Sequence, residues 1–283
     1  MTPPAATDPA ALLDALAWQV ELGADEAIAE APIDRFAESA ESAATAPAPP
    51  AARPRQAAPR ASEGATRTTA DARPGPAAAA GGSPAELAAG AATLEELAEA
   101  VRGWQGSPLR LAARNLVFAD GHPGARVMLV GEAPGAEEDR QGKPFVGASG
   151  RLLDLMLAAI GLGRHASAPE DAAYIANILP WRPPGNRSPS DDEVAQFLPF
   201  LERHIALAQP EVIVTLGGVS TKHLLGVSQG ITRLRGRWAR HEPSGLPLLP
   251  TLHPAFLLRS PAQKRLAWRD LLALRAFLDG EAP

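Results

Sequence analysis

The stretch ARVMLVGEAPG, residues 125–135, places an apolar run directly before a turn rich in glycine and proline. Short apolar runs bounded by Gly or Pro indicate buried strands. Four such strands are predicted, at residues 125–130, 173–178, 212–216 and 246–251. Helical patterns alternate with them, at residues 93–104, 150–160, 191–208, 220–225 and 261–278. This alternation predicts an α/β fold in which helices cover both faces of a parallel sheet.

The N-terminal third has a different composition from the rest of the chain. In the acidic segment 1–39, residues 9–31 place apolar side chains at roughly helical spacing with acids between them, which predicts an amphipathic helix. Residues 40–92 are rich in Ala, Pro and Gly and predict a disordered linker. We therefore expect residues 93–283 to form the folded domain. The helix would bind a protein partner, mimic DNA or have no specific role.

Composition excludes several classes of protein. The chain contains no cysteine, so it has no disulfide, thiolate metal site or cysteine nucleophile, and it fits a reducing compartment such as the cytoplasm. No run approaches ~18 apolar residues, so we expect no membrane span. The net charge is -5, but residues 93–283 hold 21 basic and 20 acidic side chains. Such a domain can bind nucleic acid where basic residues cluster, as they do at Arg233, Arg235, Arg237 and Arg240.

The first candidate site is the turn GEAPG at residues 131–135, after the first strand. Its glycines would let backbone N–H groups approach a ligand, and Glu132 could orient a water molecule. A tight turn with solvated acids explains the same residues equally well. The spacing G-x-G-x-x-G is missing, which disfavours a dinucleotide site. Phe145 follows in the loop GKPFVG, residues 142–147, where its ring is offered for stacking or packs in the core.

Asn177 lies at the end of the second strand and is the second candidate. Its side-chain amide carries one donor and one acceptor group, which complements the O4 and N3–H of uracil and mismatches cytosine. Asparagine at a strand end is also a common turn former. The loop after it contains Arg187 and Ser188, residue types that contact phosphate but also suit an exposed turn.

His253 comes directly after the last strand and precedes a proline. An imidazole in this position can point into a cleft and stabilise negative charge on a leaving group, although a structural role is an alternative. The next residues, FLLR at 256–259, either enter a base stack from the minor groove or begin the last helix.

These three motifs, in this order and spacing, resemble those of the family 4 uracil-DNA glycosylases of bacteria and archaea. The resemblance runs from about Trp104 to Phe277. It implies a three-layer α/β/α sandwich around a central parallel four-stranded sheet. The function it implies is repair of DNA by hydrolysis of the N-glycosidic bond of a flipped-out uracil, which leaves an abasic site.

The resemblance also implies roles for individual residues. Glu132 and His253 would be catalytic. Those around the uracil would be Glu132, Ala133, Pro134, Phe145, Asn177 and His253. For contacts with DNA, the loops and the basic segment predict Arg187, Ser188, Arg233, Arg235, Arg237, Leu257 and Arg259. Uracil-containing DNA is the expected partner, with no membrane involved, and we expect a monomer.

One feature departs from the family. Family 4 enzymes usually hold an iron-sulfur cluster through four cysteines, and the corresponding positions here are Trp104, Ser107, Trp181 and Phe197. None of these side chains is a thiolate ligand, so we expect no cofactor and no metal. The three aromatic residues predict a hydrophobic packing that takes over the structural role of the cluster.

Three alternatives to this function remain open on the sequence. A related glycosylase would also act on hypoxanthine or xanthine. A non-turnover binder would be trapped covalently on uracil-containing DNA, although the basic insertion of such relatives is missing between Asn177 and Asp191. A non-enzymatic DNA-binding module would use mainly residues 233–240.

Overall fold

The structure is a computed structural model that describes residues 82–282. The predicted amphipathic helix of segment 1–39, and the linker as far as residue 81, lie outside the described residues. The described range holds the last residues of the predicted linker and the predicted folded domain as far as residue 282.

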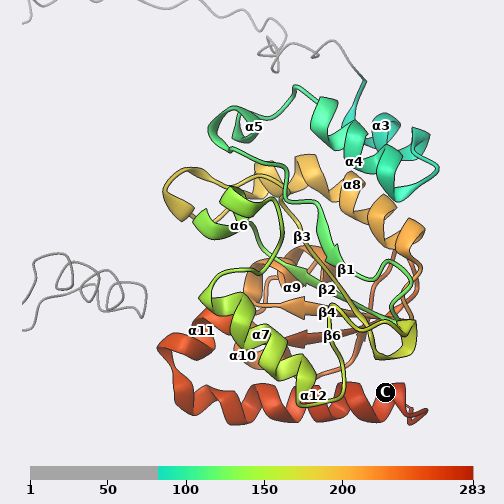
Figure 1. The fold of residues 1–283 in the computed structure, drawn as a ribbon, viewed down its shortest axis with the longest axis vertical. Coiled ribbons are helices and arrows are strands. Elements are labelled where there is room, and N and C mark those ends of the chain that lie inside the picture. The colour runs from blue at the N-terminus through green and yellow to red at the C-terminus, as the bar shows by residue number, and fades with distance from the viewer. Residues whose placement is uncertain (1–81, 283) are drawn as a thin grey trace, which may run out of the picture. The chain divides into compact units, whose positions relative to one another are not determined.

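The described part of the chain is built on one six-stranded sheet with the order β1-β3-β2-β4-β6-β5 (Figure 1). Four central strands are parallel and match the four predicted strands: β2 (Val127–Gly131), β3 (Ala173–Asn177), β4 (Val212–Leu216) and β6 (Pro247–Thr251). Two short antiparallel strands, β1 (Ala119–Gly121) and β5 (Ala239–Arg240), add the edges. At three and two residues these edge strands are too short to show a periodic pattern.

Side chains alternate between the two faces of the sheet and divide the core in two. From β2, Met128 and Val130 enter one hydrophobic cluster, whereas Val127 and Leu129 enter the other. Both clusters are buried, so the central strands are covered on both faces, as in other parallel sheets. The predicted three-layer α/β/α arrangement is therefore confirmed.

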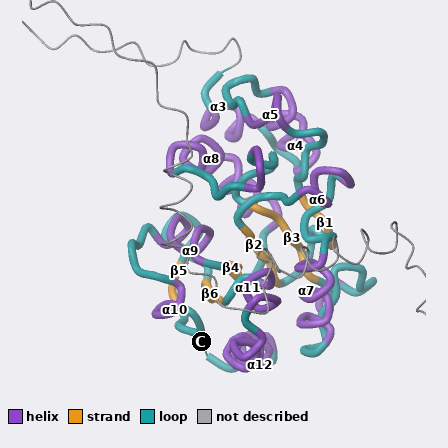
Figure 2. The backbone as a smooth tube through the Cα atoms, turned by 90° about the vertical axis from the view of Figure 1, so that its left-hand side faces the viewer, coloured by secondary structure: helices purple, strands orange, loops and turns teal. Residues whose placement is uncertain are grey.

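Helices form the two outer layers, as Figures 1 and 2 show. The layer beside Met128 includes α4 (Leu94–Gly103) and α8 (Asp191–Ala208), and the opposite layer includes α7 (Ala148–Ala158) and α12 (Lys264–Leu278). Shorter helices connect or extend these elements: α5 (Leu109–Ala112), α6 (Ala136–Gln141), α9 (Gly218–Leu225), α10 (Ile231–Leu234) and α11 (Pro254–Arg259). Single 3-10 turns occur at Pro169–Asp171, Pro184–Asn186 and Pro261–Gln263.

Helix α3 (Pro84–Gly90) lies in the range predicted to be linker, so the ordered chain begins earlier than expected. Ser83 caps it, with reciprocal hydrogen bonds to Glu86. The helix is mostly alanine and glycine, a composition that resembles the linker before it. It is ordered because Ala88 and Ala91 are small enough to pack closely on the core beside α8.

The four positions predicted to replace the cysteines are all buried, with Trp104 at the end of α4 and Phe197 on α8. The ring centroids of Trp104 and Phe197 are 5.4 Å apart in an edge-to-face arrangement, and Phe200 lies 5.7 Å from Trp104. Trp181 is buried in the same hydrophobic cluster, and Ser107 is also buried. We refer to Trp104, Phe197 and Phe200 as the aromatic cluster.

None of the helices within residues 82–282 is long and apolar enough to cross a membrane.

The aromatic cluster should contribute strongly to stability. Phe197 is 0% exposed, so Phe197→Ala should lower the free energy of unfolding by about 3–5 kcal/mol through lost burial and the cavity left behind. Urea unfolding of the purified protein measures the change. The control is Leu111→Ala on α5, whose leucine is 82% exposed and should change stability by no more than about 0.5 kcal/mol. Equal midpoints for Phe197→Ala and the unmodified protein would contradict this assignment.

Candidate active site

The three motifs meet because the parallel strands end at one edge of the sheet. In the register of β2 with β3, Gly131 stands beside Asn177, and Leu216 of β4 stands beside Thr251 of β6. Beyond the strand ends, the N–H groups of Ile178 and Leu179 donate to the carbonyls of residues 131 and 132, each at 3.1 Å. The first two motifs therefore form one continuous backbone surface.

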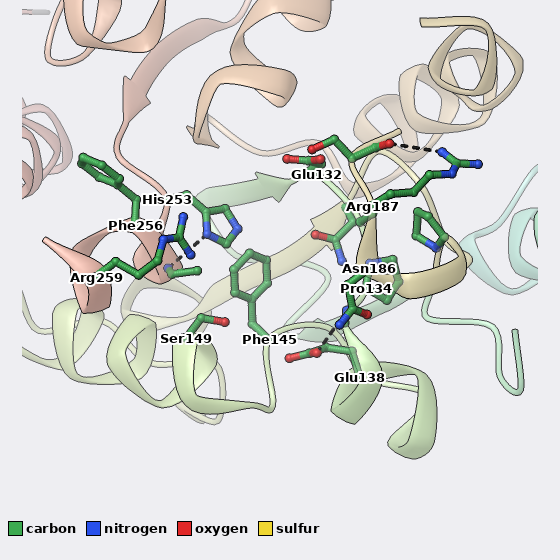
Figure 3. Close-up of a pocket in the computed structure, with 16 residues that line it drawn as sticks. Glu132, Pro134, Glu138, Phe145, Ser149, Asn186, Arg187, His253, Phe256 and Arg259 are labelled. Carbon is green, nitrogen blue, oxygen red and sulfur yellow. Dashed lines mark hydrogen bonds between the residues drawn. The ribbon is translucent and has the colours of Figure 1, made fainter. Parts of the chain in front are cut away.

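A pocket of about 490 Å³ opens at this edge, within the range usual for small-molecule sites. Figure 3 shows the Phe145 side chain in the pocket, with His253 and Arg259 toward one side of it and Pro134 and Arg187 toward the other. All six residues predicted to surround a base line this pocket: Glu132, Ala133, Pro134, Phe145, Asn177 and His253.

Gly131 lets Asn177 and Phe145 approach each other. A Cβ atom at position 131 would lie 2.3 Å from Oδ1 of Asn177 and 2.7 Å from the ring of Phe145. Both distances are far below van der Waals contact. The glycine is therefore needed for space, which the pattern GEAPG did not reveal.

Asn177 supplies an acceptor that the protein leaves unused. Its Oδ1 atom is buried and has no hydrogen-bond partner among the described residues. Buried polar atoms are nearly always paired, so an unpaired one in a pocket indicates a group that a ligand can satisfy. Phe145, which is 5% exposed, lies beside this oxygen. A ligand would therefore displace the ring or stack on it when it reaches Asn177.

The hydrogen bonding of His253 determines which ring nitrogen carries the proton. The residue is the N-cap of α11, and its Nδ1 accepts a hydrogen bond of 3.1 Å from the Ala255 N–H. A neutral ring with an accepting Nδ1 must carry its hydrogen on Nε2. Burial lowers the pKa of His253 to about 4, and the positive charge of Arg259 acts in the same direction. The ring is thus a neutral donor at pH 7.

Gly217, at the end of β4, lets this histidine lie close to the sheet edge. Its φ of +96° is a conformation that favours glycine, and a Cβ there would lie 3.0 Å from Cβ of His253. The centroid of the His253 ring is 5.5 Å from that of Phe145. The two rings therefore form adjacent walls of the pocket.

Three residues predicted to contact DNA lie at the pocket: Arg187, Ser188 and Arg259. Arg187 forms two hydrogen bonds with Glu193, of 2.7 and 2.6 Å, which lower the pKa of that carboxyl to about 2. Its side chain remains 49% exposed, so it can still meet a phosphate. Arg259 is exposed beside the pocket.

The other predicted DNA contacts are not brought to the pocket. Arg233 and Arg237 are exposed but do not line it. Arg235 pairs instead with Asp270 and donates to the Leu266 carbonyl at 2.6 Å. Leu257 is 1% exposed within the core, because α11 turns that side chain inward. Arg235 and Leu257 are therefore not available for contact with DNA.

Further residues line the pocket: Gly135, Glu138, Ser149, Pro183, Asn186, Ala255 and Phe256. Of these, the sequence suggested only Glu138, as a candidate near the base without a decisive feature, and Phe256, in the segment that could enter a base stack. Glu138 is the most informative of them. Its carboxylate accepts hydrogen bonds from the N–H groups of Gly135, Val146 and Gly147, at 3.2, 3.0 and 2.9 Å. Glu138 is the third residue of α6 after its N-cap, Gly135, and an acidic residue at this position, which can accept from the N-cap N–H, was the available signal in the sequence.

The chain is similar in sequence to known uracil-DNA glycosylases. Residues 118–272 match the family model of the uracil DNA glycosylase superfamily. A type-4 uracil-DNA glycosylase of Sulfurisphaera tokodaii is 37% identical over 191 residues, which cover 65% of this chain and 84% of that protein. A type-4 uracil-DNA glycosylase of Thermotoga maritima is 36% identical over 194 residues, which cover 66% of this chain and 96% of that protein.

The residues of this chain do not fit an iron-sulfur cluster. At the positions where the resemblance implies cysteines, Trp104 and Phe197 pack edge to face, and Trp181 and Ser107 are buried without any thiolate donor. Among residues 82–282, no group of three or more His, Asp or Glu side chains could hold a metal ion.

The protonation state of His253 can be measured directly. Nitrogen-15 NMR should show hydrogen on Nε2 at pH 7 and a titration midpoint near pH 4, with the signal assigned by its loss in His253→Gln. Arg259→Gln should raise the midpoint, because it removes a positive charge that opposes protonation.

The same shift should affect stability. The unfolded ring binds a proton near its ordinary pKa of 6.5, whereas the folded ring does so only near 4. The contribution of His253 to folding should therefore weaken as the pH falls from 6.5 to 4, and His253→Gln should lose that dependence. A midpoint near 6.5, or hydrogen on Nδ1, would contradict the assigned hydrogen bond.

Proposed function

This chain belongs to the uracil-DNA glycosylase superfamily, and we propose on that basis that it removes uracil from DNA through the pocket at the edge of its sheet. The product would be an abasic site in an otherwise intact strand. The observation that supports this assignment most strongly is the unpaired Oδ1 of Asn177, which lies in one pocket with Phe145 and a neutral His253.

Recognition of the base begins with its extrusion from the helix, at an unstacking cost of a few kcal/mol. The Phe145 ring offers a face on which the base can stack. The Oδ1 of Asn177 can accept from N3–H of uracil while its Nδ2 donates to O4. Cytosine presents the reverse pattern at these two positions, so it leaves Asn177 unpaired in this orientation of the amide and is disfavoured.

Cleavage generates charge on both fragments as the bond between C1′ and N1 breaks. The electron pair leaves with uracil, and the Nε2–H of His253 stabilises the resulting anion as a hydrogen-bond donor. Glu132 orients the water molecule that attacks C1′. Its carboxyl group also stabilises the positive charge that develops on the sugar. The hydroxide part of this water molecule bonds to C1′ of the sugar. The remaining proton of the water neutralises the released uracil anion.

Contacts outside the pocket would place the DNA strand. Arg187, Ser188 and Arg259 lie at the pocket and are the proposed partners of the flanking phosphates. Arg233 and Arg237 are exposed and would extend this contact along the duplex. We further propose that the protein acts as a monomer in the cytoplasm, a compartment whose reducing conditions fit a chain without cysteine. The acidic segment 1–39 remains a candidate for binding a protein partner.

A cleavage assay tests this function. An end-labelled oligonucleotide with one uracil, treated with the protein and then alkali, should give a fragment cut at that position. His253→Ala and Asn177→Ala should each slow the reaction by roughly a hundred- to a thousandfold, as removal of one preorganised group does. His165→Ala, at an exposed histidine outside the pocket, serves as the control and should keep the full rate.

Other outcomes of the same assay have distinct meanings. Cleavage at hypoxanthine as well would indicate a broader base scope, and a shifted band that survives denaturation would indicate a covalent trap. Near-normal turnover in both pocket variants would refute the assignment of the pocket.

Gly131→Ala should also slow excision, by roughly a hundredfold or more. The new methyl group would occupy the space of the Asn177 oxygen and displace the Phe145 ring. Gly218→Ala is a matched control at the same edge of the sheet, because its new Cβ would have no neighbour closer than 3.9 Å. Circular dichroism should show both variants folded. Full activity of folded Gly131→Ala would mean that the base does not bind between these two side chains.

A further inference from the structure

Phe145 adopts a backbone conformation that a bulky residue rarely takes. Its φ is +53°, in the left-handed region, where only glycine and small polar residues lie without strain. Such conformations persist when the surrounding structure imposes them, and they concentrate at functional sites. The structure must therefore contain groups that hold this residue in place.

Arg164, in the connection between α7 and β3, provides such a group. Its guanidinium donates to the carbonyls of Pro144 and Phe145, at 2.9 and 2.8 Å. On the other side of the same loop, Glu138 accepts from the N–H groups of Val146 and Gly147. A cation thus fixes the carbonyls of the loop and an anion fixes its N–H groups.

The guanidinium of Arg164 is buried and paired with two acidic side chains. Arg164 is 6% exposed, and its charge is balanced by Asp154 at 2.7 Å and Asp120 at 3.2 Å. Burial of a charged group lowers stability unless the group is paired and hydrogen-bonded. The two aspartates and the two carbonyls supply these partners for Arg164. Gly150 of α7 completes the support, because a Cβ there would lie 1.8 Å from the Phe145 carbonyl oxygen.

We infer that Arg164 is a positioning residue for uracil excision, holding the backbone of Phe145 so that its ring forms the stacking face of the pocket. This inference rests on the proposed function, but it assigns a role to a residue outside the pocket. The guanidinium does not touch the base. It acts through the orientation of Phe145, and a small displacement of such a group can cost up to about a hundredfold in rate.

A double-mutant cycle tests this role through single-turnover rates on uracil-containing DNA. Arg164→Gln should slow excision by roughly tenfold to a hundredfold while leaving the affinity for undamaged DNA unchanged. Once Phe145→Ala has removed the ring, adding Arg164→Gln should cause little further loss. Arg164→Lys should recover part of the rate, since an ammonium group can still donate to a carbonyl but lacks the planar fork. If the glutamine variant does not fold, the lysine variant takes its place in the cycle.

The control is Arg203→Gln on α8. Arg203 is partly buried and donates to a backbone carbonyl, that of Ala91, at 2.9 and 2.7 Å, but it does not line the pocket. It should lower stability without changing the rate. Independent, additive losses from Arg164→Gln and Phe145→Ala would overturn the inference, as would an unchanged rate in Arg164→Gln.

A second readout does not depend on catalysis. The His253 ring lies 5.5 Å from the Phe145 ring, so its NMR proton shifts report the position of Phe145 without DNA. Arg164→Gln should change these shifts and Arg203→Gln should not. If the unmodified protein fails to excise uracil, the proposed function fails, and the shifts still decide whether Arg164 positions Phe145. Unchanged shifts in Arg164→Gln would refute that role.

Discussion

The pairing of β2 with β3 on one side and β4 on the other is the constraint on which the pocket depends. Because these strands are parallel and in register, their carboxyl ends stop at the same level and place Gly131 beside Asn177. The third motif lies at the same edge of the sheet because it follows β6, which pairs in parallel with β4. Residues far apart in sequence thus become neighbours through backbone hydrogen bonds, and their side chains remain free for chemistry.

The pocket combines neutral and charged groups. An amide oxygen, an aromatic ring and an imidazole that is neutral at pH 7 line it together with the acidic side chains of Glu132 and Glu138, and with Arg187 and Arg259. A neutral donor can stabilise the departing anion without attracting the phosphates of DNA into the pocket. Salt bridges such as that of Arg187 with Glu193 hold the edge in place while leaving much of the arginine accessible. The same side chain thus serves structure and, in our proposal, binding.

The sequence predicted the four central strands, the long helices and the six pocket residues, because strand-end motifs carry a local pattern that topology then brings together. It missed what depends on distant contacts. Arg164 stands in an unremarkable loop, and nothing near it in sequence shows that its side chain reaches residues 144 and 145. Arg235 and Leu257 fitted simple patterns of basic and apolar residues, but the structure directs the first to Asp270 and the second into the core. The short edge strands β1 and β5 and the alanine-rich α3 were not predicted for a related reason. Tertiary packing stabilises them, and their sequences carry no periodic pattern of apolar residues.

Buried aromatic side chains stand at three of the four positions where the family resemblance implies cysteine ligands. Trp181 is buried in the core cluster that also holds Trp104 and Phe197, and in the chain it lies between Asn177 and the loop that carries Asn186 and Arg187. Burial of this large ring restrains the start of that loop. Because the groups assigned to catalysis come from the strand ends, this region can change its packing without changing the proposed reaction.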